Sequence, residues 1–267
     1  MDKPQYIDWL IKEEGIALED GTPITCFKID YSDDESVLDQ WALHIRRHYI
    51  NDQELLESVD IYETDVESYL RKHVIPQKGD DLGPTARSGD ITEILIADLL
   101  EYIMGYSVPR YKQMNRSGIS NSEHGTDVIG YKFISADKIP NSNDELIAAE
   151  VKAALTSNDY TPIKKAIIDS QKDEERLAHT IDYCRKKLKY LGNKVQSEEI
   201  KRFSFKPEND YKIVYMAAGV SSRETVDMVI KFTDDEKVVI NCNQSVFYIH
   251  GKRLMELAHN IYERCIR

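Results

Sequence analysis

The sequence lacks the features of membrane, secreted and zinc-finger proteins. None of its hydrophobic runs approaches the ~20 residues that a membrane-spanning helix needs. The N-terminus, MDKPQYIDWLIKEEG, is acidic rather than basic and then apolar, which argues against a secretory signal. The cysteines are scattered and form no CxxC pair, which argues against a zinc knuckle and a disulfide framework; they are Cys26, Cys184, Cys242 and Cys265. We therefore expect a protein of the reducing cytoplasm.

The motifs of several large enzyme classes are also missing. The chain contains no GxxxxGK[ST] P-loop, no GxGxxG and no GxSxG, so an ATPase, a dinucleotide-dependent enzyme and an α/β-hydrolase are poorly supported. It has no internal repeat and no low-complexity tract. With 41% hydrophobic and 31% charged residues, the 267-residue chain has the composition of a globular protein with one large domain or two small ones.

The charge is unevenly distributed along the chain. A formal net charge of −12 is unusual for a DNA-binding protein, because phosphates attract basic surfaces. Nearly all of the acidic excess lies in residues 1–90, and residues 91–267 are close to neutral. The segment QKGDDLGPTARSGD, residues 77–90, predicts a loop where the balance changes. We expect an acidic N-terminal α+β region over 1–80, which either docks on a partner or maintains solubility, and a second domain over 81–267.

The pattern of apolar residues predicts an α/β fold. The expected core elements are a helix over residues 90–105, strands over 108–115, 125–135 and 145–155, a long helix over 161–191 and a strand over 211–220. Before them we expect a strand over 25–31 and helices over 36–50 and 52–72, and a final helix follows residue 251. The order helix, three strands, helix, strand predicts a mixed sheet flanked by helices.

Two charges interrupt the apolar strand ELIAAEVKAAL, residues 145–155. Glu150 and Lys152 are two residues apart and therefore share one face of the strand. Ionised groups at the edge of an apolar core cost free energy unless something compensates them. An acidic residue two positions before a lysine occurs four times, but only this copy lies in an apolar strand; the others are Glu199–Lys201, Asp210–Lys212 and Asp235–Lys237. The alternative is an exposed ion pair on an edge strand, which would contribute little.

Two further carboxylates precede this strand, Asp127 in GTD and Glu93 in GDITE. Asp127 and Glu150 could hold one or two Mg²⁺ ions against a scissile phosphate, with Glu93 completing the ligand set; Mn²⁺ is the alternative ion. Such an ion polarises the phosphoryl group and lowers the pKa of water, and Lys152 could position that water or offset developing charge. Two structural alternatives stay open. Asp90 and Glu93 have the spacing of a capping box, and Asp127 follows a glycine and could shape a turn.

The motifs GDITE, GTD and AEVK, in this order, resemble those of the PD-(D/E)XK nuclease superfamily. The resemblance implies a restriction-endonuclease-like core, αβββαβ, with Asp127, Glu150, Lys152 and Glu93 in the active site. The proline that usually precedes the aspartate is absent, and Gly125-Thr126 stands there instead. The separation between Asp127 and Glu150 implies a loop insertion over residues 136–144.

The whole chain also resembles the DUF1837-type nuclease subunit (HamA-like) of the Hachiman anti-phage system, in RSGDITEILIADLLE, EVKAAL and AIIDSQKDEERLAHTI. This resemblance implies a Mg²⁺-dependent DNA nuclease that forms a heterodimer with a large ATP-dependent helicase (HamB-like). It also implies that DNA is cleaved once the helicase engages it. Two other functions stay open: a catalytically inactive interaction subunit that regulates or loads a helicase, and a stand-alone structure-specific repair nuclease.

A few other features have two interpretations. His44 and His48 have helical spacing and could bind zinc, but no third ligand is evident and a solvated pair is favoured. His124 could contact a phosphate or simply belong to a loop. The polar block SQKDEE, residues 170–175, either faces the cleft and orients Lys152 or marks where the helix leaves the core. The basic stretch RKKLKYLGNK, residues 185–194, contacts DNA or forms a solvated helix face.

Overall fold

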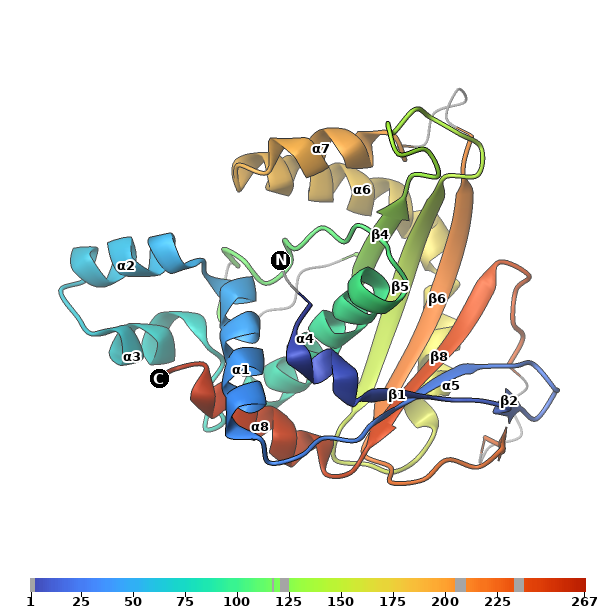
Figure 1. Cartoon of the computed structure of the whole chain (residues 1–267), viewed down its shortest axis with the longest axis horizontal. Helices are drawn as coiled ribbons and strands as arrows, with labels where there is room; N and C mark the ends of the chain where they lie inside the picture. Colours follow the sequence, from blue (N-terminus) through green and yellow to red (C-terminus); the bar gives the residue numbers. More distant parts are fainter. Residues whose placement is uncertain (1–2, 117, 121–124, 205–209, 233–237) are drawn as a thin grey trace.

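The structure is a computed structural model that describes residues 3–116, 118–120, 125–204, 210–232 and 238–267. Its main sheet has six strands: β1 (Leu10–Glu13), β3 (Thr25–Ile29), β4 (Val128–Lys132), β5 (Glu145–Ala154), β6 (Lys212–Ser221) and β8 (Gln244–Gly251). Their order is β1-β3-β8-β6-β5-β4 (Figure 1). The four inner strands are parallel, and β1 and β4 lie antiparallel at the two edges. The expected mixed α/β architecture is confirmed.

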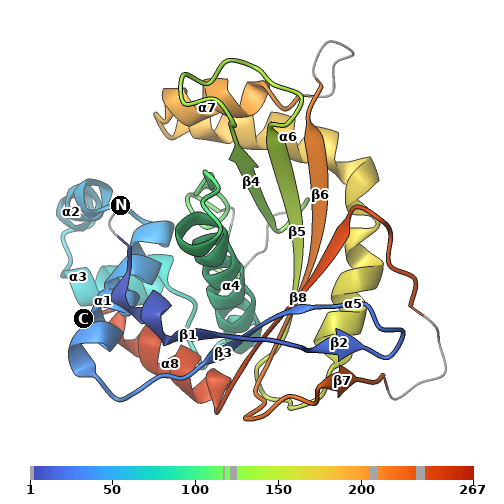
Figure 2. The same cartoon turned by 45° about the vertical axis from the view of Figure 1, so that its right-hand side comes forward.

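Helices cover both faces of this sheet (Figure 2). One face carries α1 (Glu35–Tyr49), α4 (Gly83–Asp98) and α8 (Leu254–Arg264), and the other carries α5 (Thr161–Ser170) and α6 (Asp173–Tyr190), with α7 (Lys194–Lys201) beside α6. The smaller elements are η1 (Gln5–Trp9), α2 (Asp52–Ile61), α3 (Val66–Tyr69), two single π-helical turns, η2 (Leu70–Val74) and η3 (Leu99–Ile103), and a parallel pair formed by β2 (Ala17–Leu18) and β7 (Val229–Ile230).

The two faces of β5 belong to different cores. Ile147, Ala149 and Val151 pack in the core that α4 covers, whereas Leu146 and Ala148 pack in the core that α6 covers. Successive side chains of a strand point to opposite faces. Glu150 and Lys152 therefore face the side of α5 and α6.

Residues on both sides of position 80 share one sheet and one core. β3 pairs with β8, and Tyr6 and Trp41 pack in the same apolar cluster as Ile94 and Ile261. Tyr6 and Trp41 stack with their ring centroids 4.0 Å apart. The division into 1–80 and 81–267 stays a prediction.

The helix expected over 90–105 begins earlier, at Gly83, where Pro84 occupies the first turn. The prediction of a loop over residues 77–90 is therefore wrong for residues 83–90, which are helical. Asp90 lies within the helix, and its carboxylate pairs with Arg116, 2.5 Å from Asp90 Oδ1 to Arg116 Nη2. The capping-box interpretation of Asp90 and Glu93 is therefore wrong.

No strand forms over residues 108–115, so the described residues between α4 and α5 contain two strands, β4 and β5, rather than the three expected. Just before this segment, Ser107 forms an isolated bridge to Tyr131 of β4. The side chains of this segment turn instead to the carboxylates of α4: Arg110 to Asp98, Lys112 to Glu93. Strand propensity did not reveal these ion pairs, because they depend on a helix distant in sequence from the segment's own pattern.

The long helix expected over 161–191 is divided at Gln171 and Lys172 into α5 and α6. The helix expected over 52–72 is likewise divided, into α2, α3 and η2. Within the described part of the chain, no helix is long and apolar enough to span a membrane.

Candidate functional site

The candidate site lies where the pairing between β4 and β5 ends. The two strands pair only over Glu145–Ala149 of β5, so β5 has no β4 partner from Glu150 onward. Asp127 directly precedes β4 at this opening, and its Oδ2 accepts a hydrogen bond from the Val151 backbone N–H at 2.8 Å. The strand register thus brings Asp127, Glu150 and Lys152 together.

Glu150 is a buried carboxylate, 4% exposed. Its Oε1 accepts a hydrogen bond from Lys152 Nζ at 2.5 Å, whereas its Oε2 is buried and has no hydrogen-bond partner within the described part of the chain. Burial, and next the charge of Asp127, raise the pKa of Glu150. The interpretation of Glu150 and Lys152 as an exposed surface pair is therefore wrong.

Lys152 is held by two carboxylates. Its Nζ lies 2.5 Å from Glu150 Oε1 and 3.2 Å from Asp169 Oδ2 at the end of α5. Burial works to lower the pKa of Lys152, but its hydrogen bond to Glu150 and the neighbouring negative charges outweigh this and raise it. Lys152 is therefore an ammonium ion at neutral pH, and 30% of its side chain is exposed.

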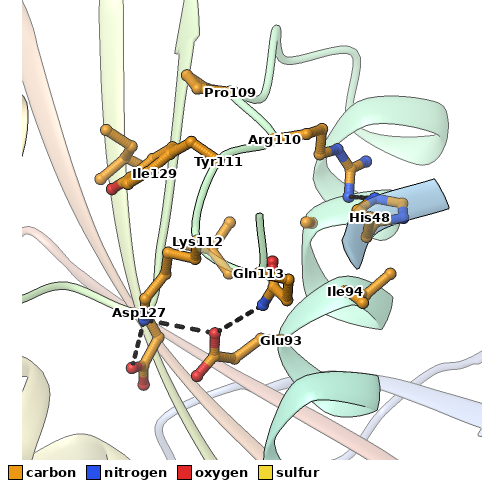
Figure 3. Close-up of a pocket in the computed structure, with 12 residues that line it drawn as sticks. His48, Glu93, Ile94, Pro109, Arg110, Tyr111, Lys112, Gln113, Asp127 and Ile129 are labelled. Carbon is orange, nitrogen blue, oxygen red and sulfur yellow. Dashed lines mark hydrogen bonds and ion pairs between the residues drawn. The ribbon is translucent and has the colours of Figure 1, made fainter. Parts of the chain in front are cut away.

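Glu93 lies on α4, across the sheet from Glu150, and a lysine separates it from Asp127 (Figure 3). Lys112 Nζ is 3.4 Å from Glu93 Oε2 and 3.2 Å from Asp127 Oδ1, and Gln113 donates a hydrogen bond to Glu93 at 3.3 Å. The adjoining cavity measures about 20 Å³, room for about one water molecule. Burial raises the pKa of Glu93, against the opposing charge of Lys112.

The sequence motifs did not identify Lys112, Asp169 and Asp173 as members of the site. Asp173, the first residue of α6, is fully buried; its Oδ1 accepts a hydrogen bond from Thr126 Oγ1 at 3.0 Å, and its Oδ2 has no hydrogen-bond partner in the described ranges. Burial, and next the charge of Glu150, raise the pKa of Asp173 to about 7. The sequence feature that pointed to two of these residues was the polar block 170–175, which contains Asp173 and directly follows Asp169.

Carboxylate oxygens are the ligand type that a hard divalent cation such as Mg²⁺ prefers, but no three of the site's carboxylates have oxygens within 4.8 Å of one another among the described residues. Two of these oxygens, Glu150 Oε2 and Asp173 Oδ2, are buried and have no hydrogen-bond partner among the described residues, which is costly unless a cation compensates them. Glu93 is less accessible to the same ion, because Lys112 lies between it and Asp127. Thus the structure brings three of the four predicted residues together and places the fourth behind a lysine.

His44 and His48 are buried rather than solvated, which corrects the favoured interpretation. His44 Nε2 lies 3.0 Å from Asp98 Oδ2, and Arg110 pairs with the same carboxylate at 2.7 Å. Burial, together with Arg110, lowers the pKa of His48 to about 3, so the ring is neutral. The spacing of the two histidines did not reveal Asp98, which lies beside them in the fold and contacts His44. His124 lies outside the described residues.

The basic stretch 185–194 lies on α6 and reaches the start of α7. Arg185 and Lys186 form ion pairs with Asp182 on the exposed side of α6. These contacts fit a solvated helix face.

Comparison with known proteins assigns nearly the entire chain to one family. A family model described as HamA matches residues 4–265. No curated protein matches the chain.

Proposed function

The chain belongs to the HamA family, which makes it a Hachiman defence subunit, and from this premise we propose that it is a Mg²⁺-dependent DNA nuclease. The observation that carries the proposal is the Glu150–Lys152 pair, which is held in a buried strand beside Asp127. A buried carboxylate with one unpartnered oxygen, next to a fixed and partly exposed ammonium ion, matches the needs of phosphodiester hydrolysis.

Glu150 and Asp127 are the residues that would hold the ion. Bound Mg²⁺ supplies polarisation of the phosphoryl group and an acidified water. Asp127 is oriented for this role because the Val151 backbone N–H fixes its Oδ2. Its Oδ1 forms an ion pair with Lys112 Nζ at 3.2 Å.

Lys152 acts as a fixed positive charge rather than as a base. Its raised pKa keeps the proton on Nζ, and contacts to Glu150 and Asp169 hold the ammonium group in one place. From there it binds a non-bridging oxygen of the scissile phosphate and stabilises the negative charge that develops during cleavage. Removal of a group of this kind typically lowers the rate about 10²–10³-fold.

Lys152→Met therefore tests the proposal. We expect cleavage of plasmid DNA in Mg²⁺ to fall about 10²–10³-fold, while circular dichroism and co-purification with the helicase stay unchanged. Asp182→Asn, on the exposed side of α6, is the matched control and should cleave like the wild type. Equal rates for wild type and Lys152→Met would exclude this site.

We further propose that the partner is a large ATP-dependent helicase and that the substrate is DNA. Family membership supports the Hachiman setting, in which such a partner is expected. Co-expression with the helicase followed by size-exclusion chromatography tests the partnership. A nuclease chain that always elutes alone would contradict it.

One observation favours a second function, a catalytically inactive subunit that regulates the helicase. Lys112 lies between two of the predicted ligands, and the adjoining cavity has no room for a phosphate group. The two functions differ in one outcome. Phage protection that persists after replacement of both Glu150 and Lys152 would support the inactive subunit.

A further inference from the structure

The charges around the candidate site do not balance. Among the described residues, three lysines contact four of the five carboxylates around it, and the positive charge of Arg176 acts on the fifth, Asp173; the carboxylates are Glu93, Asp127, Glu150, Asp169 and Asp173, and the lysines are Lys112, Lys152 and Lys172. Asp173 is the carboxylate of this set that none of the three lysines contacts. A divalent cation would compensate its charge together with that of Glu150.

The unbalanced charge lies on the side of α5 and α6. Lys112 already contacts both Glu93 and Asp127, 3.4 and 3.2 Å from their oxygens. Asp169 is shared by Lys152 and Lys172, at 3.2 and 2.5 Å. One oxygen of Glu150 and one of Asp173 remain, both buried and both without a hydrogen-bond partner among the residues that the structure describes.

Asp173 is fixed in place by its surroundings. Thr126 Oγ1 donates to its Oδ1 at 3.0 Å, and Thr126 directly precedes Asp127, whose own carboxylate bonds the backbone next to Glu150. The N-terminus of α6 offsets part of its negative charge, but Oδ2 still lacks a donor. The break between α5 and α6 makes this possible, because it turns the first residue of α6 into the protein interior.

We infer that Asp173 is a ligand of a divalent cation that Glu150 also binds, at a position that the sequence motif does not include. The inference deepens the proposed nuclease function and rests on it for the role of the cation. In this arrangement Lys112 is the counter-ion of Glu93, so residues of β5 and α6 rather than of α4 would hold the cation together with Asp127.

The test is Mn²⁺ binding to the full-length, EDTA-treated protein, measured by isothermal titration calorimetry. Asp173→Asn keeps the size of the side chain and an acceptor for Thr126, and it should weaken Mn²⁺ binding about tenfold or more. Glu93→Gln should have a smaller effect. Asp182→Asn, elsewhere on α6, should bind like the wild type. Circular dichroism checks the fold, and the smaller Asp173→Ser replaces Asp173→Asn if that variant does not fold.

Two results would overturn the inference. One is an Asp173→Asn protein that binds Mn²⁺ with wild-type affinity, and the other is loss of Mn²⁺ binding in Glu93→Gln but not in Asp173→Asn. DNA cleavage by the same variants, each assembled with the helicase, separates this inference from the proposed function. Mn²⁺ binding that depends on Asp173, together with a wild-type assembly that does not cleave, supports the inference and contradicts the nuclease function. Cleavage and binding at wild-type levels in Asp173→Asn contradict the inference and leave the nuclease function standing.

Discussion

At the scale of single residues, Asp173 gives the site a characteristic pH dependence. Its pKa of about 7 lies above that of an unfolded aspartate, so between about pH 4 and pH 7 the folded state holds a proton that the unfolded state has released. The metal-free protein therefore loses stability as the pH rises through this window. The loss is complete above about pH 7 and amounts to about 4 kcal/mol at most.

Urea unfolding at several pH values, in EDTA, measures this effect. The difference in unfolding free energy between Asp173→Asn and wild type should grow from pH 4 to pH 7 and then stay constant. A difference that does not change with pH would show that Asp173 has an ordinary pKa in the folded protein.

Lys112 should stabilise the metal-free protein because its buried ammonium group contacts the buried Glu93 and the half-buried Asp127. Lys112→Met removes one partner of a buried ion pair, which typically costs about 3 kcal/mol or more. We expect a lower Tm in EDTA that Mn²⁺ partly restores, measured by differential scanning calorimetry. Lys138→Met removes an exposed lysine and should leave the Tm nearly unchanged. An unchanged Tm for Lys112→Met would contradict the counter-ion role.

Glu150 and Lys152 were predictable because their charges stand out in an apolar strand. Lys112 and Asp173 were not predictable, because neither charge interrupts an apolar run. Their importance comes from burial and from partners distant in sequence, such as Asp127 for Lys112 and Glu150 for Asp173. The local pattern holds no information on these contacts.

At the scale of elements, the close approach of α5 to β6 positions the carboxylates. A Cβ on Gly219 of β6 would lie 2.7 Å from the backbone nitrogen of Ile163 in α5, so only glycine fits there. Gly219→Ala should push α5 outward and destabilise the protein by about 1–3 kcal/mol. Since α5 carries Asp169 and leads to Asp173, Mn²⁺ affinity should fall as well.

Gly89→Ala is the control for this substitution. Gly89 lies within α4, and a Cβ there meets no atom within 4 Å, so the variant should be as stable as the wild type or slightly more stable. Thermal unfolding of both variants measures whether the added methyl group destabilises the protein only at Gly219. A Gly219→Ala protein as stable as Gly89→Ala would show that α5 adjusts without cost.

Strands and helices with strong apolar periodicity were predicted well, including β5, β6, α1 and α8. The errors concern segments whose conformation depends on distant partners. Residues 108–115 have strand-forming side chains, yet Arg110 and Lys112 are drawn to α4. The break between α5 and α6 falls in a polar block that still has good helix propensity, so it could not be located from that propensity alone.

At the scale of the whole molecule, the acidic N-terminal region is structurally integrated with the rest. β1 and β3 continue the main sheet, and Trp41 of α1 packs in the same core as residues of α4 and α8. We expect residues 81–267 alone not to fold cooperatively, because deletion exposes β8 and this core. Circular dichroism melting checks this. A sharp transition in the shortened chain would contradict it and would support an independent C-terminal domain.

The measurement that most directly tests the central claim is the rate of plasmid cleavage against Mg²⁺ concentration, with wild type and Glu150→Gln each assembled with the helicase. We predict that the wild-type rate rises with Mg²⁺ and saturates, while the Glu150→Gln rate stays at background throughout, because the substitution neutralises the central buried carboxylate of the site. A Glu150→Gln rate equal to the wild type, or a wild-type rate that does not depend on Mg²⁺, would contradict the account.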